Sequence, residues 1–126
     1  MKLELGIHRA LAIAVACTLA TPTAAQTWPA RPVRIISPFS PGGGTDIVGR
    51  LLAQKLTEQI GGSFVVENRP GAAATIGATL VARAAPDGYT LLISAPEMSI
   101  NPSLRSKLPY DPLKDFAFIS QLTSGQ

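Results

Sequence analysis

The chain has 126 residues, of which 46% are apolar and 15% are charged, and its formal net charge is +3. Disordered chains have the opposite balance of apolar and charged residues, so this composition excludes disorder and predicts a packed core. The basic side chains are scattered without a Lys/Arg run, which argues against nucleic-acid binding and against a polybasic membrane-binding patch.

The N-terminal segment 1–25 has the layout of a secretory signal peptide. A weakly basic start precedes an alanine-rich apolar run at residues 10–20, and Pro22 and the small residues 23–25 follow. The run is too short to span a membrane, which requires about 20 apolar residues. We therefore predict cleavage after Ala25 and export to the periplasm. A buried N-terminal helix is the alternative interpretation.

The only cysteine and the only histidine of the chain, Cys17 and His8, both lie in that segment. A mature chain of residues 26–126 would contain neither. Catalysis by Ser–His or Cys–His pairs and metal sites built from Cys and His are thereby excluded from the mature chain. We expect it to have no catalytic centre, no metal site and no cofactor.

The mature chain predicts alternating strands and helices, separated by segments rich in glycine and proline. Strands are predicted where β-branched and apolar residues run together, and helices where apolar residues recur every three or four positions. In chain order, the predicted elements are a strand at 33–37, a helix at 45–60, a strand at 64–67, a helix at 78–84, a strand at 89–94, a short helix near Ser103 and the start of a fourth strand at 116–120.

The first predicted helix has the clearest start signal. Thr45 is a favourable N-cap residue, and Asp46 follows in the first turn, where the helix dipole stabilises an acid. Gly61 and Gly62 end the helix. Its core-facing side is predicted from the apolar residues at helical spacing, which are Ile47, Val48, Leu51, Leu52, Leu56 and Ile60.

Strands and helices that alternate at this spacing form βαβ units. They predict the α/β class, with a parallel βαβαβ sheet, right-handed crossovers and flanking helices. Ligands of such sheets bind beyond the carboxyl ends of the strands. Those ends are followed by the segments 38–46, 68–77 and 94–96, which we call the first, second and third loops. We expect these loops to meet at one edge of the sheet.

The first loop contains consecutive glycines at 42–44, directly before a predicted helix. Backbone N–H groups without neighbouring side chains can approach an anion, and the helix dipole favours negative charge there. The first loop does not match the known nucleotide-binding motifs. No Gly-Lys-Ser/Thr follows its glycines, and Ile47 stands where the dinucleotide-binding motif has glycine. A carboxylate is therefore the predicted anion. The alternative is that the glycines only form a tight turn.

Other residues of the loops also have two interpretations. Asp46 either stabilises the first helical turn or receives an ammonium or hydroxyl group of a ligand. Asn68 either caps or turns the chain, or reaches the ligand. The alanines 72–74 of the second loop are also ordinary helix-forming sequence.

An ordered set of segments resembles the tripartite tricarboxylate transporter receptors, the Bug-type periplasmic solute-binding proteins. The segments are WPARPVRII at 28–36, PFSPGGGTD at 38–46, VENRPGAAATIG at 66–77, APDGYTL at 85–91, NPSL at 101–104 and LPYDP at 108–112.

The resemblance implies a periplasmic binding protein of type II, in which a cleft between two domains closes on a small carboxylated solute. Such a receptor, expected to be a monomer, delivers its solute to a membrane permease. Residues 26–126 would form an incomplete first domain, without the second domain and the returning segment. The chain would then be a fragment or a truncated product. A non-functional remnant and a small α/β enzyme are the alternatives.

The resemblance also implies which residues bind the ligand. They lie in the three loops and are Phe39, Pro41, Gly42, Gly43, Thr45 and Asp46, then Asn68, Gly71, Ala73, Thr75 and Gly77, then Ser94 and Ala95. The second loop departs from the pattern of the family, because Ala73 and Ala74 stand where glycines are usual. Their methyl groups would narrow the approach of a ligand or a water molecule.

Overall fold

The computed structural model describes residues 27–124, and the predicted signal peptide at 1–25 lies outside this part of the chain. Within the described part the elements are β1 (Val33–Ser37), α2 (Gly44–Ile60), β2 (Phe64–Asn68), α3 (Thr75–Ala82), β3 (Thr90–Leu92) and α4 (Glu97–Leu104). None of these helices has the length and apolar character needed to cross a membrane.

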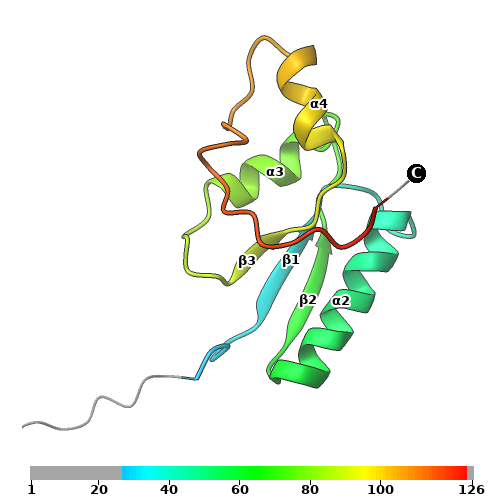
Figure 1. Cartoon of the computed structure of the whole chain (residues 1–126), viewed down its shortest axis with the longest axis vertical. Helices are drawn as coiled ribbons and strands as arrows, with labels where there is room; N and C mark the ends of the chain where they lie inside the picture. The colour runs from blue at the N-terminus through cyan, green and yellow to red at the C-terminus, as the bar shows by residue number, and fades with distance from the viewer. Residues whose placement is uncertain (1–26, 125–126) are drawn as a thin grey trace, which may run out of the picture.

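The strands form one parallel sheet in the order β2-β1-β3, with β1 in the centre. Ile35 of β1 lies opposite Val66 of β2 and opposite Leu91 of β3. The crossover helices cover opposite faces of the sheet, with α2 packed on β1 and β2 and α3 packed on β1 and β3 (Figure 1). This arrangement confirms the predicted α/β class with a parallel βαβαβ sheet.

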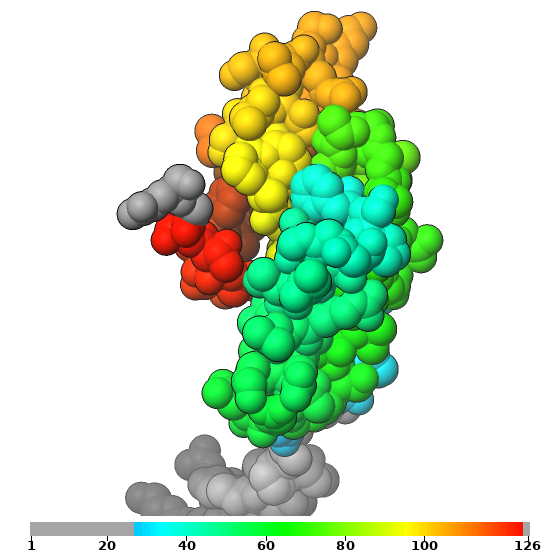
Figure 2. Space-filling model, turned by 90° about the vertical axis from the view of Figure 1, so that its right-hand side faces the viewer, coloured from blue at the N-terminus to red at the C-terminus, as the bar shows by residue number. Residues whose placement is uncertain are grey.

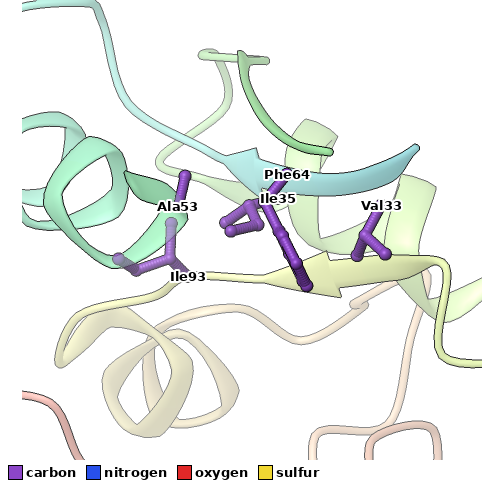
Figure 3. Packing of buried hydrophobic residues seen from close by; sticks show 5 residues of the cluster. All are labelled: Val33, Ile35, Ala53, Phe64 and Ile93. Atoms are coloured by element: carbon purple, nitrogen blue, oxygen red, sulfur yellow. The ribbon is translucent and has the colours of Figure 1, made fainter. Parts of the chain in front are cut away.

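Apolar clusters fill the space on each side of the sheet. The cluster under α2 consists of Val33, Ile35, Ala53, Phe64 and Ile93 (Figure 3). On the other side, Ala78 of α3 packs with Met98 of α4 and with Tyr110. Ile35 and Ile36 point to opposite faces and are both buried. The central strand is therefore apolar on both sides, as a parallel sheet covered by helices requires.

The core-facing side of α2 differs from the prediction. Val48, Leu52 and Leu56 pack on the core as expected, but Ile47 and Leu51 are 59% and 60% exposed. The reason lies in two small residues on the inward face of the helix. Gly49 and Ala53 are buried, and a Cβ atom at Gly49 would lie 3.5 Å from the Ile93 side chain. This close packing turns the flank of the helix that carries Ile47 and Leu51 away from the sheet.

The predicted N-cap of α2 is wrong by two residues. Gly43 occupies the cap position, and no side chain caps the helix. The carbonyl oxygen of Gly43 accepts the Ile47 N–H at 3.0 Å, so the helical hydrogen bonds begin before Thr45. Thr45 therefore lies inside the first turn, where its hydroxyl cannot serve as a cap.

Thr45→Ala is accordingly expected to change the free energy of unfolding by less than about 0.5 kcal/mol. A true N-cap threonine would cost about 0.5–2 kcal/mol when removed. Urea denaturation of the two chains distinguishes these outcomes. A loss above about 1 kcal/mol would contradict the cap position that the structure gives to Gly43.

Later elements are shifted or absent relative to the prediction. α3 begins three residues early, β3 is shorter than 89–94, and the short helix expected near Ser103 is α4. The fourth strand is wrong: residues 116–120 form no strand, and Phe118 and Ile119 are 74% and 81% exposed. A strand needs a neighbour for its backbone groups, and this segment pairs with none in the described part of the chain. Residues 115–120 instead line a hollow together with β3 and the end of α3, and the end of the described chain stands away from the body of the molecule (Figure 2).

Candidate functional site

The first and second loops lie side by side at the carboxyl ends of β1 and β2 (Figure 1). The Arg69 N–H donates to the Ser37 carbonyl oxygen at 2.7 Å. The Asn68 amide donates to the Phe39 carbonyl oxygen at 3.1 Å. On the other side of β1, the Ile93 N–H donates to the Ile36 carbonyl oxygen at 3.0 Å. The topology thus brings the three predicted loops to one edge of the sheet.

The glycines of the first loop leave its backbone open. Gly42 has a φ of +83°, which favours glycine. Gly43 has a φ of −77°, and a Cβ there would make only an ordinary contact of 3.6 Å with the Ser40 carbonyl oxygen. A Cβ at Gly44 would meet nothing within 4 Å. The turn therefore requires glycine at position 42, whereas glycine at 43 and 44 leaves space above the backbone.

Asp46 holds the first loop in place. The residue is only 3% exposed. One carboxylate oxygen accepts the Gly42 N–H and the Arg50 Nε–H, both at 3.0 Å, and the other accepts the Asn68 amide at 2.9 Å. The Arg50 guanidinium, the Gly42 N–H and the Asn68 amide hold the pKa of Asp46 well below its usual range. Of the two interpretations, these contacts support the structural one.

Asn68 completes this network. Its amide nitrogen donates to Asp46 and Phe39, and its carbonyl oxygen accepts the Arg50 Nη2–H at 3.3 Å. All the polar atoms of the Asn68 side chain are therefore engaged in joining β2 to the first loop. Arg50 was missed by the sequence analysis, although its position four residues after an acid on a helix is the usual spacing of an ion pair.

The second loop has an unusual backbone. Gly71 has a φ of +128°, and the alanines 72–74 have φ values of +48°, +52° and +69°. Of the two interpretations of 72–74, the one as ordinary helix-forming sequence is therefore wrong, because these residues precede α3, which begins at Thr75. A left-handed conformation costs an alanine about 1–2 kcal/mol, so other contacts must hold this turn.

Unpaired donors line the two loops. Among the described residues, no acceptor pairs with the N–H groups of Gly43, Gly44, Ala73 and Ala74. The hydroxyl of Thr75, a predicted site residue, is buried without a hydrogen-bond partner in the same part of the chain. The Ser37 hydroxyl at the end of β1 is buried in the same way and was missed by the sequence analysis. Buried polar groups are normally hydrogen-bonded, so these hydroxyls favour a polar ligand or water here.

Gly77 joins α3 to the first loop. It is buried, and a Cβ at this position would lie 2.8 Å from the Pro38 Cβ, 3.0 Å from the Pro38 Cα and 3.0 Å from the Arg69 carbonyl oxygen. The glycine thus allows the helix to pack directly on the chain after β1. Its position fits a packing role better than ligand contact.

The third loop is separate from the other two in its contacts. The Ser94 hydroxyl donates to Glu97, and the Ala95 N–H donates to the same carboxylate oxygen at 3.0 Å. Ser94 and Ala95 line a hollow of about 750 Å³ together with β3, the end of α3 and residues 115–120. No residue of the first or second loop lines it.

The geometry of the site therefore divides the predicted residues. Phe39, Asp46, Asn68 and Gly77 hold the loops through the contacts described above. The other predicted residues of the first and second loops with an exposed or partly exposed position are Pro41, Gly42, Gly43, Thr45, Gly71 and Ala73. Within residues 27–124, no group of His, Cys, Asp or Glu side chains is arranged to hold a metal ion.

Known proteins resemble this chain in sequence and structure. The model of the family described as "Tripartite tricarboxylate transporter family receptor" matches residues 48–126. Protein BugT of Bordetella pertussis is 42% identical over 106 residues, which are 82% of this chain and 32% of BugT. This chain thus spans about a third of the length of that relative.

Solved structures agree with this match. The periplasmic binding protein BugD is 46% identical with a TM-score of 0.68, over 71% of this chain and 30% of BugD. MatC of Rhodopseudomonas palustris with bound malate is 39% identical with a TM-score of 0.62, over 71% of this chain and 31% of MatC.

Proposed function

This chain belongs to the tripartite tricarboxylate transporter receptor family, and from that premise we propose that it acts as part of a periplasmic receptor for a small carboxylated solute. The receptor would pass the solute to the membrane permease of its transporter. We propose that it acts as a monomer and a binding protein without catalytic activity or cofactor. The structure of the relative MatC with bound malate supports a carboxylate as the ligand.

The observation that carries this proposal is the set of unpaired N–H groups where the first and second loops meet. The start of α2 adds the positive end of its dipole, which stabilises an anion by about 0.3–1 kcal/mol at an exposed position. The buried, unpaired Thr75 hydroxyl adds a donor at the start of α3. A ligand carboxylate would accept hydrogen bonds from these groups, directly or through water.

The contacts suggest different roles for the predicted site residues. In this proposal Gly43, Ala73 and Thr75 face the carboxylate. Asp46 and Asn68 keep the first loop in position, because their polar atoms already bind each other, Arg50 and the loop. Ser94 and Ala95 would contact a part of the solute that extends toward β3.

The affinity of this surface alone is expected to be low. A micromolar complex requires about −8 kcal/mol, while the loss of ligand freedom on binding costs about 4 kcal/mol or more. One carboxylate site with a helix dipole and several hydrogen bonds does not supply that difference. We therefore expect the chain to bind malate in the millimolar range, which NMR titration measures well.

Gly43→Val tests the backbone site. The variant should weaken malate binding at least tenfold, about 1.4 kcal/mol, because its side chain covers the N–H groups at the start of α2. The fold should persist, since Gly43 has an ordinary φ and a Cβ there meets only a 3.6 Å contact. The measurement is a malate titration of the isotope-labelled chain, followed through the amide signals of both loops.

Gln59→Ala, at the exposed far end of α2, is the matched control and should bind like the unmodified chain. Equal malate affinity of Gly43→Val and the unmodified chain would refute the backbone site. If succinate, adipate and malate all leave the amide signals of the unmodified chain unchanged at concentrations of tens of millimolar, the proposed ligand class is wrong for these loops.

A further inference from the structure

The left-handed turn of the second loop is held by a side chain from a distant element. Asn101 of α4 is only 3% exposed, and its amide nitrogen donates to the Ala73 carbonyl oxygen at 2.9 Å. The two residues are 28 positions apart in sequence. Ala73 is the middle residue of the three left-handed alanines, so this hydrogen bond holds the centre of the turn in place.

This contact also fixes the direction of a neighbouring donor. The carbonyl of Ala73 and the N–H of Ala74 belong to one trans peptide unit, so they point in opposite directions. Because Asn101 draws the carbonyl toward α4, the Ala74 N–H is directed away from α4. That N–H is unpaired among the described residues and adjoins Thr75, whose buried hydroxyl also lacks a partner.

We propose that Asn101 is a positioning residue, which keeps the second loop left-handed and thereby directs its N–H groups toward the ligand carboxylate or its bridging water. The identity of the ligand in this inference rests on the proposed function. The role of Asn101 in holding the left-handed turn does not depend on it. Asn68 does the same for the first loop, where its amide holds the Phe39 carbonyl oxygen. Each loop is thus held through one of its carbonyl groups by an asparagine that lies outside that loop. Asn68 holds the first loop, and Asn101 holds the second loop.

Asn101→Asp tests this inference in the full chain. Aspartate has the same shape, but its ionised carboxylate cannot donate to a carbonyl. The backbone carbon chemical shifts of residues 72–74 should move away from left-handed values, and the malate affinity should fall at least fivefold. Ser103→Ala, at an exposed position of the same helix, is the control and should leave both unchanged.

A second substitution separates positioning from general stability. Glycine adopts the left-handed conformation without penalty, so Ala73→Gly added to Asn101→Asp should restore at least half of the lost affinity. It should also restore the fold if Asn101→Asp alone unfolds the chain. Left-handed shifts that persist in Asn101→Asp, or a double variant no better than Asn101→Asp, would overturn the inference.

Ligand binding and the conformation of the second loop are measured separately, by malate titration and by backbone chemical shifts. Absence of malate binding by the unmodified chain counts against the proposed function, whereas the chemical shifts of residues 72–74 decide the role of Asn101 in either case.

Discussion

Gly77→Ala should destabilise the fold by about 2 kcal/mol, because it overpacks a buried contact. The added methyl group would lie 2.8–3.0 Å from Pro38 and from the Arg69 carbonyl oxygen. Neither neighbour can yield easily, since one is a proline ring and the other is main chain. The better helix propensity of alanine offsets up to about 1 kcal/mol of the cost. Urea denaturation at neutral pH measures the net effect.

Gly44→Ala is the matched control for this prediction. It also places an alanine in a helix, but its Cβ would meet nothing within 4 Å. Its free energy of unfolding should therefore stay within about 0.5 kcal/mol of the unmodified chain. If Gly77→Ala is as stable as Gly44→Ala, the close packing of α3 on Pro38 is not present in solution.

Asp46→Asn should lower the melting temperature at neutral pH by roughly 10 °C, given the usual size of charge-assisted hydrogen bonds and the response of a domain of this length. The substitution removes the charge that Arg50, Gly42 and Asn68 surround. The same bonds lower the pKa of Asp46 in the folded chain. Its ionised form therefore stabilises the fold above the pKa of the unfolded chain, about 3.9.

This stabilisation should disappear as the pH falls from about 4 toward the lower pKa of the folded chain. Thermal unfolding of both chains between pH 7 and pH 2 should show the difference between them shrinking in that range. Glu58→Gln, on the exposed side of the same helix where Glu58 pairs with Lys55, is the control and should have a much smaller effect. A difference between Asp46→Asn and the unmodified chain that stays constant down to pH 2 would show that the charge of Asp46 is not its source.

The parts of the fold that depend on local patterns could be predicted from the sequence. β1 was predicted with its observed bounds, because a central parallel strand is a short, continuous apolar run. The fourth strand was not predictable in this way, since residues 116–120 have a strand-like composition but no pairing partner in the described part of the chain. Likewise, helical spacing could not show that Gly49 and Ala53, rather than Ile47 and Leu51, face the sheet.

The meeting of the loops at one edge of the sheet was predictable, but the contacts that their residues make depend on distant parts of the chain. Topology alone puts the loops at one edge of the sheet. The contact between Asp46 and Asn68 joins residues 22 positions apart, and no local pattern marks it. The left-handed turn at 72–74 contradicts the helix propensity of alanine. Its support by Asn101 could be recognised only once α4 lay beside it.

The proposed site consists of main-chain donors, and this has a consequence for how this chain tolerates mutation. The chemical group offered to the ligand is the same for every residue type except proline, so changes at the contact positions 43 and 73 alter access and backbone geometry rather than chemistry. The positions that tolerate few replacements are instead expected to be those whose residues do not contact the ligand in the proposed arrangement. In a saturation mutagenesis experiment, Asp46, Asn68, Gly77 and Asn101 should accept few replacements, whereas small residues should exchange freely at position 43. If the residues that tolerate the fewest replacements were taken as the binding site, they would therefore mark the residues that hold the loops in place. They would miss the main-chain N–H groups that are proposed to bind the carboxylate.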